Sequence, residues 1–155
     1  MIRLVPVLLL ALAACSTGPS TPKFADADPC ALLKDGDAGG LTGTPAKSGQ
    51  ACDFTFDSLT AKLTLVEAAY ADESGKLLSD GGYGGVVAGG PGESNNRPLS
   101  TRCKDSAGVV TCDAVLEVRE RQLVTFQVVQ RGKDRNEVGH AVQALAAKAF
   151  ERLPK

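Results

Sequence analysis

The positions of five cysteines constrain the fold of this 155-residue chain more than any other feature. Cys15 stands alone near the N-terminus, after a run of leucines and alanines. The other four lie in the body of the chain, at Cys30, Cys52, Cys103 and Cys112. No Cys-x-x-Cys pair occurs, so the pattern is typical of neither a thioredoxin-like redox pair nor a zinc knuckle. The compartment of the protein decides whether these cysteines are disulfides or thiols.

Residues 1–14 predict a secretory signal peptide. Arg3 supplies a positive charge, and the run from Leu4 to Ala14 is a short apolar segment that ends in small residues. The run is too short for a transmembrane helix, which needs about 20 apolar residues. We therefore expect the chain to be exported.

Leu12-Ala13-Ala14-Cys15 resembles the lipobox of bacterial lipoproteins, Leu-[Ala/Ser]-[Gly/Ala]-Cys. The resemblance implies cleavage before Cys15 and acylation of its thiol. Two or three acyl chains anchor a protein stably, whereas one chain holds it only marginally. We expect a lipid-anchored protein on the extracytoplasmic side of the cell membrane. An ordinary secretory signal followed by a chance cysteine is the alternative.

The lipid assignment of Cys15 leaves an even number of cysteines in the exported chain, which favours two disulfides. Of the three pairings, we predict those between neighbours, Cys30–Cys52 and Cys103–Cys112. A tight turn at residues 105–108 would put Cys103 and Cys112 two residues out of register, so their bond requires a wider loop or a diagonal geometry. Four buried thiols are the alternative.

The composition excludes several classes of partner. The formal net charge is −1, aromatic residues make up 5% of the chain and tryptophan is absent. The chain therefore carries neither the charge nor the stacking residues typical of nucleic-acid binding, and we expect no nucleic-acid partner. The single histidine and four oxidised cysteines leave too few ligands for a zinc site, so we predict no metal and no cofactor.

The N-terminal part of the mature chain predicts a tether and a short helix. Residues 15–25 comprise the lipidated cysteine and a flexible segment rich in Pro, Ser and Thr. Residues 26–155 form a single domain. Asp28 is a suitable N-cap for a short helix from Pro29 to about Lys34, because Pro is tolerated in the first turn.

Alternation of apolar and polar residues predicts four to five strands. The runs are 52–57, 59–70, 99–104, 109–119 and 123–131, with a bulge after Leu65 where the alternation changes parity. A C-terminal helix is predicted to begin with Asp134 or Asn136 as its N-cap, and Glu137 follows Asp134 by three residues, as in a capping box. Its apolar stripe should cover one face of the sheet: Val138, Val142, Leu145, Ala149 and Leu153.

Residues 71–98 predict one long irregular loop, which glycines interrupt repeatedly. We expect Gly82, Tyr83 and Gly84 to form a partner-contact site in it, because an exposed aromatic side chain on a loop makes contacts readily. No Gly-Lys-[Ser/Thr] follows the glycines, so a phosphate-binding loop is not indicated.

Two further motifs have alternative interpretations. His140 is the one candidate for a catalytic triad, but no Gly-x-Ser-x-Gly elbow supplies a nucleophile, and we predict no catalytic residue. Residues 35–40, Asp-Gly-Asp-Ala-Gly-Gly, partly match a calcium loop. The twelfth position of that loop is Ala46, where a bidentate Glu belongs, which favours a solvated turn.

The order of these motifs resembles a family of actinobacterial secreted lipoproteins with an Asp-Pro-Cys-x-Leu-Leu motif, catalogued as a domain of unknown function. The match rests on the lipobox, residues 27–33 (Ala-Asp-Pro-Cys-Ala-Leu-Leu), residues 51–54 (Ala-Cys-Asp-Phe) and the later cysteine pair. The glycines after Leu33 depart from the longer helix that this family often shows. The resemblance implies an α+β domain with two disulfides and no established activity.

The predicted fold is therefore α+β: an antiparallel sheet of four to five strands with a C-terminal helix on one face. The leading function is a non-enzymatic binding domain in the cell envelope, anchored to the membrane and contacting an envelope protein or a small ligand. A carrier of an apolar ligand is the alternative, and would need a cavity among Phe54, Phe56, Leu116 and Phe126. An envelope hydrolase is a further alternative, for which the sequence shows no acid–base set.

Overall fold

The computed structural model describes residues 23–89 and 96–154. The predicted signal peptide, Cys15 and the tether up to residue 22 lie outside the described residues. Two helices and seven strands follow the short 3₁₀ turns Phe24–Asp26 and Pro29–Ala31. They are β1 (Ala46–Ser48), β2 (Ala51–Thr55), β3 (Leu59–Val66), α1 (Tyr70–Leu78), β4 (Tyr83–Val87), β5 (Arg97–Ser106), β6 (Val109–Arg119), β7 (Gln122–Arg131) and α2 (Arg135–Arg152).

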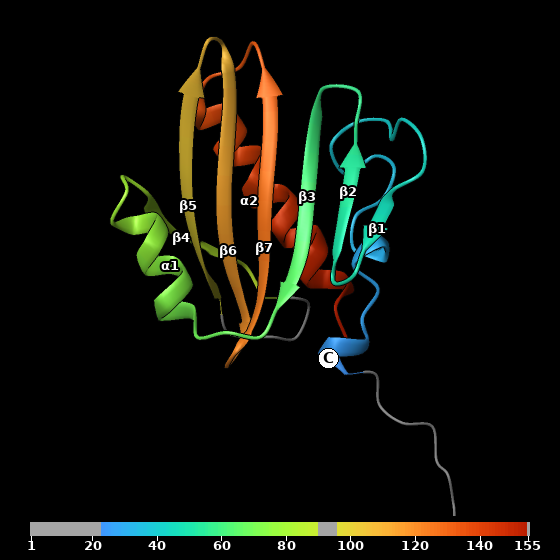
Figure 1. Cartoon of the computed structure of the whole chain (residues 1–155), viewed down its shortest axis with the longest axis vertical. Coiled ribbons are helices and arrows are strands. Elements are labelled where there is room, and N and C mark those ends of the chain that lie inside the picture. The colour runs from blue at the N-terminus through green and yellow to red at the C-terminus, as the bar shows by residue number, and fades with distance from the viewer. Residues whose placement is uncertain (1–22, 90–95, 155) are drawn as a thin grey trace, which may run out of the picture.

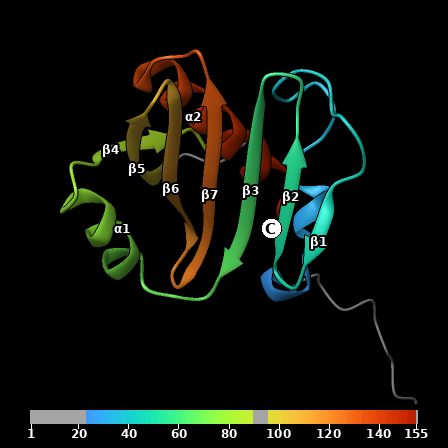
Figure 2. The same cartoon turned by 45° about the horizontal axis from the view of Figure 1, so that its top comes forward.

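The strands form one antiparallel sheet in the order β1-β2-β3-β7-β6-β5-β4. Figure 1 shows α2 running behind the sheet and α1 at its β4–β5 end. The turned view shows the edge strands β4 and β1 at opposite ends of the sheet (Figure 2). The α+β class and the C-terminal helix are confirmed. The strand number is higher than predicted, because β1 and β4 carry no clear alternation.

Helix α2 covers one face of the sheet and closes the main core. Its capping box is present: the Asp134 carboxylate accepts from the Glu137 N–H, and the Glu137 carboxylate accepts from the Asp134 N–H. All five members of the predicted stripe are buried. They pack against alternate residues of the central strands, among them Leu63, Val110, Leu116, Val124 and Val128.

The opposite face is only partly covered. Leu77 of α1 forms a second, smaller cluster with Val115 and Leu123, and Tyr70 of α1 and Val66 at the end of β3 pack against it. The ladder between β3 and β7 runs without a register shift up to Val66. The predicted bulge after Leu65 is therefore wrong, because the strand ends at Val66. The apolar residues change face there because Val66, Ala68 and Tyr70 pack against the second cluster.

The predicted loop at 71–98 is also wrong over most of its length. Residues 70–78 form α1 and residues 83–87 form β4. Gly82 lies in the connection between these elements, and Tyr83 and Gly84 lie in β4. The glycines Gly84 and Gly85 conceal the strand, because they break the alternation by which a strand is identified. Gly90 to Asn95 lie outside the described residues.

Both disulfides join the predicted pairs. Cys30–Cys52 links the 3₁₀ turn to β2 with Cα atoms 5.2 Å apart, and Cys103–Cys112 links β5 to β6 with Cα atoms 4.0 Å apart. The expectation of a wider loop or diagonal geometry is wrong, since Cys103 lies directly opposite Cys112. The strands extend to Ser106 and Val109, and only Ala107 and Gly108, both at positive φ, form the turn.

The N-terminal segment is attached to the end of α2. Phe24, which we assigned to the tether, is 5% exposed and belongs to the main core. The helix predicted from Pro29 to about Lys34 is shorter than expected, a single 3₁₀ turn, and Asp28 caps it by accepting from the Cys30 N–H. The Arg152 guanidinium pairs with the Asp37 carboxylate and donates to the Leu32 carbonyl at 3.0 Å.

Candidate functional site

The large apolar side chains that the described residues leave exposed all lie between 78 and 86. Leu78 is 45% exposed, Tyr83 51% and Val86 50%. They come from the last turn of α1 and from β4, at one edge of the sheet. Exposed single apolar residues are ordinary, but a local concentration of them is typical of interaction sites. We therefore define the edge site as Leu78, Tyr83 and Val86 with the groove beside Tyr83. The Tyr83 and Val86 side chains project to opposite faces of β4.

Strand β4 presents backbone groups away from the sheet. Among the described strands it pairs with β5 alone, and Val86 lies opposite Pro98. Pro has no N–H, so it suits a pair whose backbone groups point away from each other. The Val86 carbonyl accepts from the Gln143 side chain of α2 at 2.9 Å. Backbone groups alternate in direction along an antiparallel strand, so those of Gly84 point outward with those of Val86.

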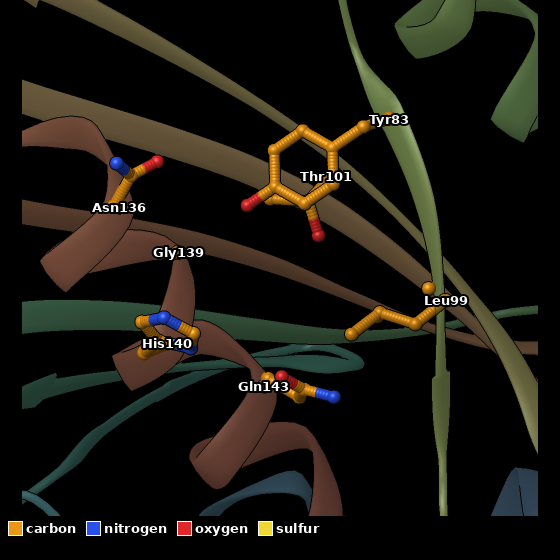
Figure 3. Close-up of a pocket in the computed structure, with 8 residues that line it drawn as sticks. Tyr83, Leu99, Thr101, Asn136, Gly139, His140 and Gln143 are labelled. Atoms are coloured by element: carbon orange, nitrogen blue, oxygen red, sulfur yellow. The ribbon is translucent and has the colours of Figure 1, made fainter.

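A groove lies between β4 and α2, on the helix-covered side of the sheet. Tyr83 and Gly85 line it from β4, Leu99 and Thr101 from β5 and Asn136, Gly139, His140 and Gln143 from α2. Its volume is about 170 Å³. Figure 3 shows the Tyr83 ring reaching from β4 toward α2, with the Leu99 side chain below it and the α2 residues along the opposite wall. None of the described residues that line this groove is Lys, Arg, Asp or Glu.

Two glycines allow the close approach of Tyr83 to the helix. A Cβ atom on Gly139 would collide with the Tyr83 hydroxyl. A Cβ atom on Gly82 would lie 2.5 Å from the Leu77 carbonyl oxygen and 2.9 Å from the Thr101 carbonyl oxygen. Gly82 therefore lies tightly packed against the backbone of α1 and β5, directly before Tyr83. Gly84 is different, because a Cβ atom there would meet nothing within 4 Å.

His140 lies at the rim of this groove and is exposed. It also borders a second groove of about 430 Å³ along α2, with Asp37, Glu137 and Lys133 among its lining residues. Glu137 is already held by Lys133, whose ammonium lies 2.8 Å from its carboxylate and lowers its pKa. Among the described residues, no group of three or more His, Cys, Asp or Glu side chains is arranged to hold a metal ion.

A third groove of about 370 Å³ lies on the partly covered face, between α1 and strands β3, β7 and β6. An ion network borders it: Arg102 lies 2.6 Å from Asp113 and 2.8 Å from Asp80, and Lys104 lies 2.7 Å from Asp80. Lys104 lowers the pKa of Asp80, and Asp113 raises that of Arg102. The two cations and the two carboxylates neutralise one another. The network therefore favours a role in holding the sheet together over a role in binding a charged ligand.

The residues of the partial calcium motif serve the fold. The Asp35 carboxylate accepts from the Leu41 N–H at 2.7 Å. The Asp37 carboxylate accepts from the Lys34 N–H at 2.7 Å, and its hydrogen bonds from Arg152 lower its pKa. The Asp37 side chain is 6% exposed, so the interpretation of a solvated turn is wrong for this residue. Both carboxylates are engaged by protein donors.

The aromatic residues considered for a carrier cavity lie in the packed core. Phe54 and Phe56 stack with ring centroids 6.3 Å apart and are 1% and 3% exposed. Leu116 and Phe126 are 0% and 2% exposed. The grooves described above are lined by other residues, except that Phe126 borders the one beneath α1.

The sequence indicated Tyr83 and its neighbouring glycines but missed the rest of the edge site. Gly85, Val86 and Leu99 lie within strands whose pairing was not predicted, and Gln143 reaches β4 across 57 residues of sequence. Gly139 is the one available signal, since a glycine inside a helix costs about 1 kcal/mol relative to alanine and therefore suggests a close contact.

The described part of the chain contains no helix long and apolar enough to cross a membrane. The two disulfides are typical of an extracellular or otherwise oxidising environment. Comparison of the chain with models of known protein families, with curated proteins and with solved structures gave no match.

Proposed function

We propose that the chain is a lipoprotein anchored through Cys15 to the extracytoplasmic side of a bacterial membrane, and that its domain binds a protein partner without catalysis. The concentration of exposed large apolar side chains between residues 78 and 86 carries the binding proposal. A few residues carry most of the binding energy of a protein interface, and Tyr is among the residues enriched there.

The position of the edge site suits this role. It lies at the β4 end of the sheet, whereas the first described residues lie near β1 at the opposite end (Figures 1 and 2). A domain tethered through its N-terminal segment would therefore present the edge site away from its attachment point. The described residues that line the adjacent groove include no Lys, Arg, Asp or Glu, which also favours a partner that contributes an uncharged side chain.

Site-specific photo-crosslinking in the cell envelope tests the binding proposal. A photoreactive residue at Tyr83 or Val86 should give the same protein adducts. A residue at Thr60 or Gln127, which are exposed on the partly covered face, is the matched control and should not give them. Identical adducts from all four positions would contradict an interaction at the edge site.

Two companion measurements test the other parts of the proposal. Metabolic labelling with a fatty acid should mark the wild-type chain and not the Cys15→Ser variant. Native mass spectrometry of the purified chain should show the mass of the protein alone after detergent removal. A bound lipid or metabolite of defined mass would instead favour the carrier.

A further inference from the structure

We infer that the partner contributes an extended polypeptide segment, which adds as a strand to the outer edge of β4 and places one uncharged side chain in the groove beside α2. This inference rests on the proposed protein-binding function and specifies the chemistry of the partner. Strand addition is a known mode of peptide recognition: main-chain hydrogen bonds provide affinity, and pockets for alternate side chains provide specificity.

The first support is the pattern of outward backbone groups. The opposition of Val86 to Pro98 and the bond from Gln143 to the Val86 carbonyl establish which residues of β4 face outward. Gly84 and Val86 therefore present their N–H and C=O groups on the outer side, two residues apart. An incoming strand needs this spacing in order to continue an antiparallel ladder. The Val86 carbonyl can accept a further bond, because a carbonyl oxygen has two lone pairs.

The second support is the absence of edge protection in β4. Native edge strands carry charged side chains, Pro or bulges, or are kept very short, because an open edge templates pairing with other chains. Residues 83–87, Tyr-Gly-Gly-Val-Val, contain no charge and no Pro. Within the described residues, no strand pairs with the outer side of β4.

The third support is the groove. An added strand would place the side chain opposite Gly85 on the α2 side of the sheet, since side chains of paired residues share a face. Gly85 itself has no side chain to fill that space, and Leu99, Gly139 and Gln143 surround it. The groove has a volume of about 170 Å³. A medium-sized uncharged side chain fits the space.

The small size of the edge argues for a peptide segment rather than a second copy of the chain. A strand of five residues is about 17 Å long. A stable interface between globular partners buries about 800 Å² on each side, and pairing of two such strands alone would not approach this area. A peptide strand would gain main-chain hydrogen bonds along β4 and a side-chain contact in the groove beside α2, and neither depends on a broad surface.

Gly84 offers a matched pair of variants for the test. Gly84→Pro removes an outward N–H, leaves the ladder to β5 intact, and is tolerated because Pro occurs on edge strands. Gly84→Ala keeps the N–H, and its Cβ atom meets nothing within 4 Å. Circular dichroism and urea unfolding establish that both variants fold. Gly85→Leu, which fills the groove from β4, and Tyr83→Ala complete the set.

The probe is a library of short random peptides, selected on the full chain purified in detergent, with the affinity of each selected peptide then measured against every variant. We expect Gly84→Pro to weaken binding by about tenfold or more through the lost hydrogen bond and the steric bulk of the ring. Gly84→Ala should stay within about twofold of the wild type. Gly85→Leu should also weaken binding, because it occupies the side-chain groove.

The remaining outcomes separate this inference from the proposed function. If Tyr83→Ala weakens binding while Gly84→Pro and Gly84→Ala bind alike, strand addition is overturned and the edge site remains a protein-binding surface. If neither Tyr83→Ala nor Gly84→Pro changes the affinity for the selected peptides, both the binding function of the edge site and strand addition to β4 are overturned. A library that yields no binder overturns strand addition. The full chain could also associate with itself. If Gly84→Pro abolished that association, the β4 edge would be assigned to a second copy of the chain, and the inference of a peptide partner would be overturned.

Discussion

The two edges of the sheet are built differently. Strand β1 has three residues, follows Pro45 and carries Lys47, whose ammonium lies 3.1 Å from Asp28. The adjacent strand β2 is also held by a disulfide to Cys30. Strand β4 has five residues and carries neither Pro nor charge, and its exposed side chains are Tyr83 and Val86. Pro and charge therefore protect the β1 edge but not the β4 edge, which is the pattern expected if association is excluded at β1 and tolerated at β4.

The same contrast extends to the segments that support the two edges. Near β1, the chain from Phe24 to Leu41 is irregular and depends on specific bonds: the Cys30–Cys52 disulfide and the pairing of Asp37 with Arg152. Near β4, the supporting element is a regular helix, α1, packed over Val115 and Leu123. We expect the stability of the β1 side to depend on single bonds. Substitutions on the β4 side should change stability little and should change instead how the protein interacts with other molecules.

The largest expected effect is the loss of the disulfide on the β1 side. Replacing Cys30 and Cys52 by Ala should reduce the free energy of unfolding by about 3 kcal/mol, because a bond across 22 residues restricts the unfolded chain. Removing Cys103 and Cys112 should cost less, about 2.5 kcal/mol, since that bond spans 9 residues. Urea unfolding of both double variants checks the order, and a larger loss for the β5–β6 bond would contradict it.

The next effect concerns the ion pair that holds the 35–40 loop. Asp37→Asn removes the charge that accepts from Arg152 and should lower the free energy of unfolding by about 2 kcal/mol. Asp105→Asn, at an exposed position in β5, is the control and should change it by less than about 0.5 kcal/mol. Equal effects of the two substitutions in urea unfolding would show that the pair contributes nothing specific.

The pH dependence of stability should follow the same pair. The Arg152 hydrogen bonds hold the pKa of Asp37 below its ordinary value of 3.8. A carboxylate with a lowered folded-state pKa stabilises the protein above the unfolded pKa, about 3.9, and this contribution is lost as the pH falls through the folded pKa. The Tm of the wild type should therefore fall below about pH 4, and the Tm of Asp37→Asn should fall less over the same range. Parallel Tm curves for the two proteins would contradict this.

The smallest effect on stability should accompany an exchange of edge protection. Val86→Lys would give β4 the kind of charge that β1 carries, and Lys47→Val would remove it from β1. Each should change the free energy of unfolding by less than about 1 kcal/mol, because both positions are exposed and the Lys47–Asp28 pair is a surface salt bridge. Lys47→Val should increase self-association in light scattering, whereas Val86→Lys should not. The reverse result would show that charge does not protect these edges.

Local patterns were sufficient for the parts of the fold that follow simple periodicities. The alternation in 109–119 predicted β6 with its observed bounds, and the stripe from Val138 to Leu153 predicted the buried face of α2. The cap residues Asp28 and Asp134 were recognisable because an N-cap depends on bonds to residues two or three positions away. The cysteine pairs were also predicted, since neighbours in sequence meet across adjacent strands or turns.

The sequence by itself therefore determined the fold class, the C-terminal helix and the main strands, and it favoured one of the three possible disulfide pairings. Only the tertiary structure decided that residues 70–87 form a helix and an edge strand, and that Tyr83 lies against Gly139. It also decided that Asp37, which looked like a turn residue, is buried against Arg152. The physical reason is the range of the interactions. Periodicity and caps arise from neighbours along the chain, whereas a glycine-rich edge, a groove and a buried ion pair arise from segments far apart in sequence.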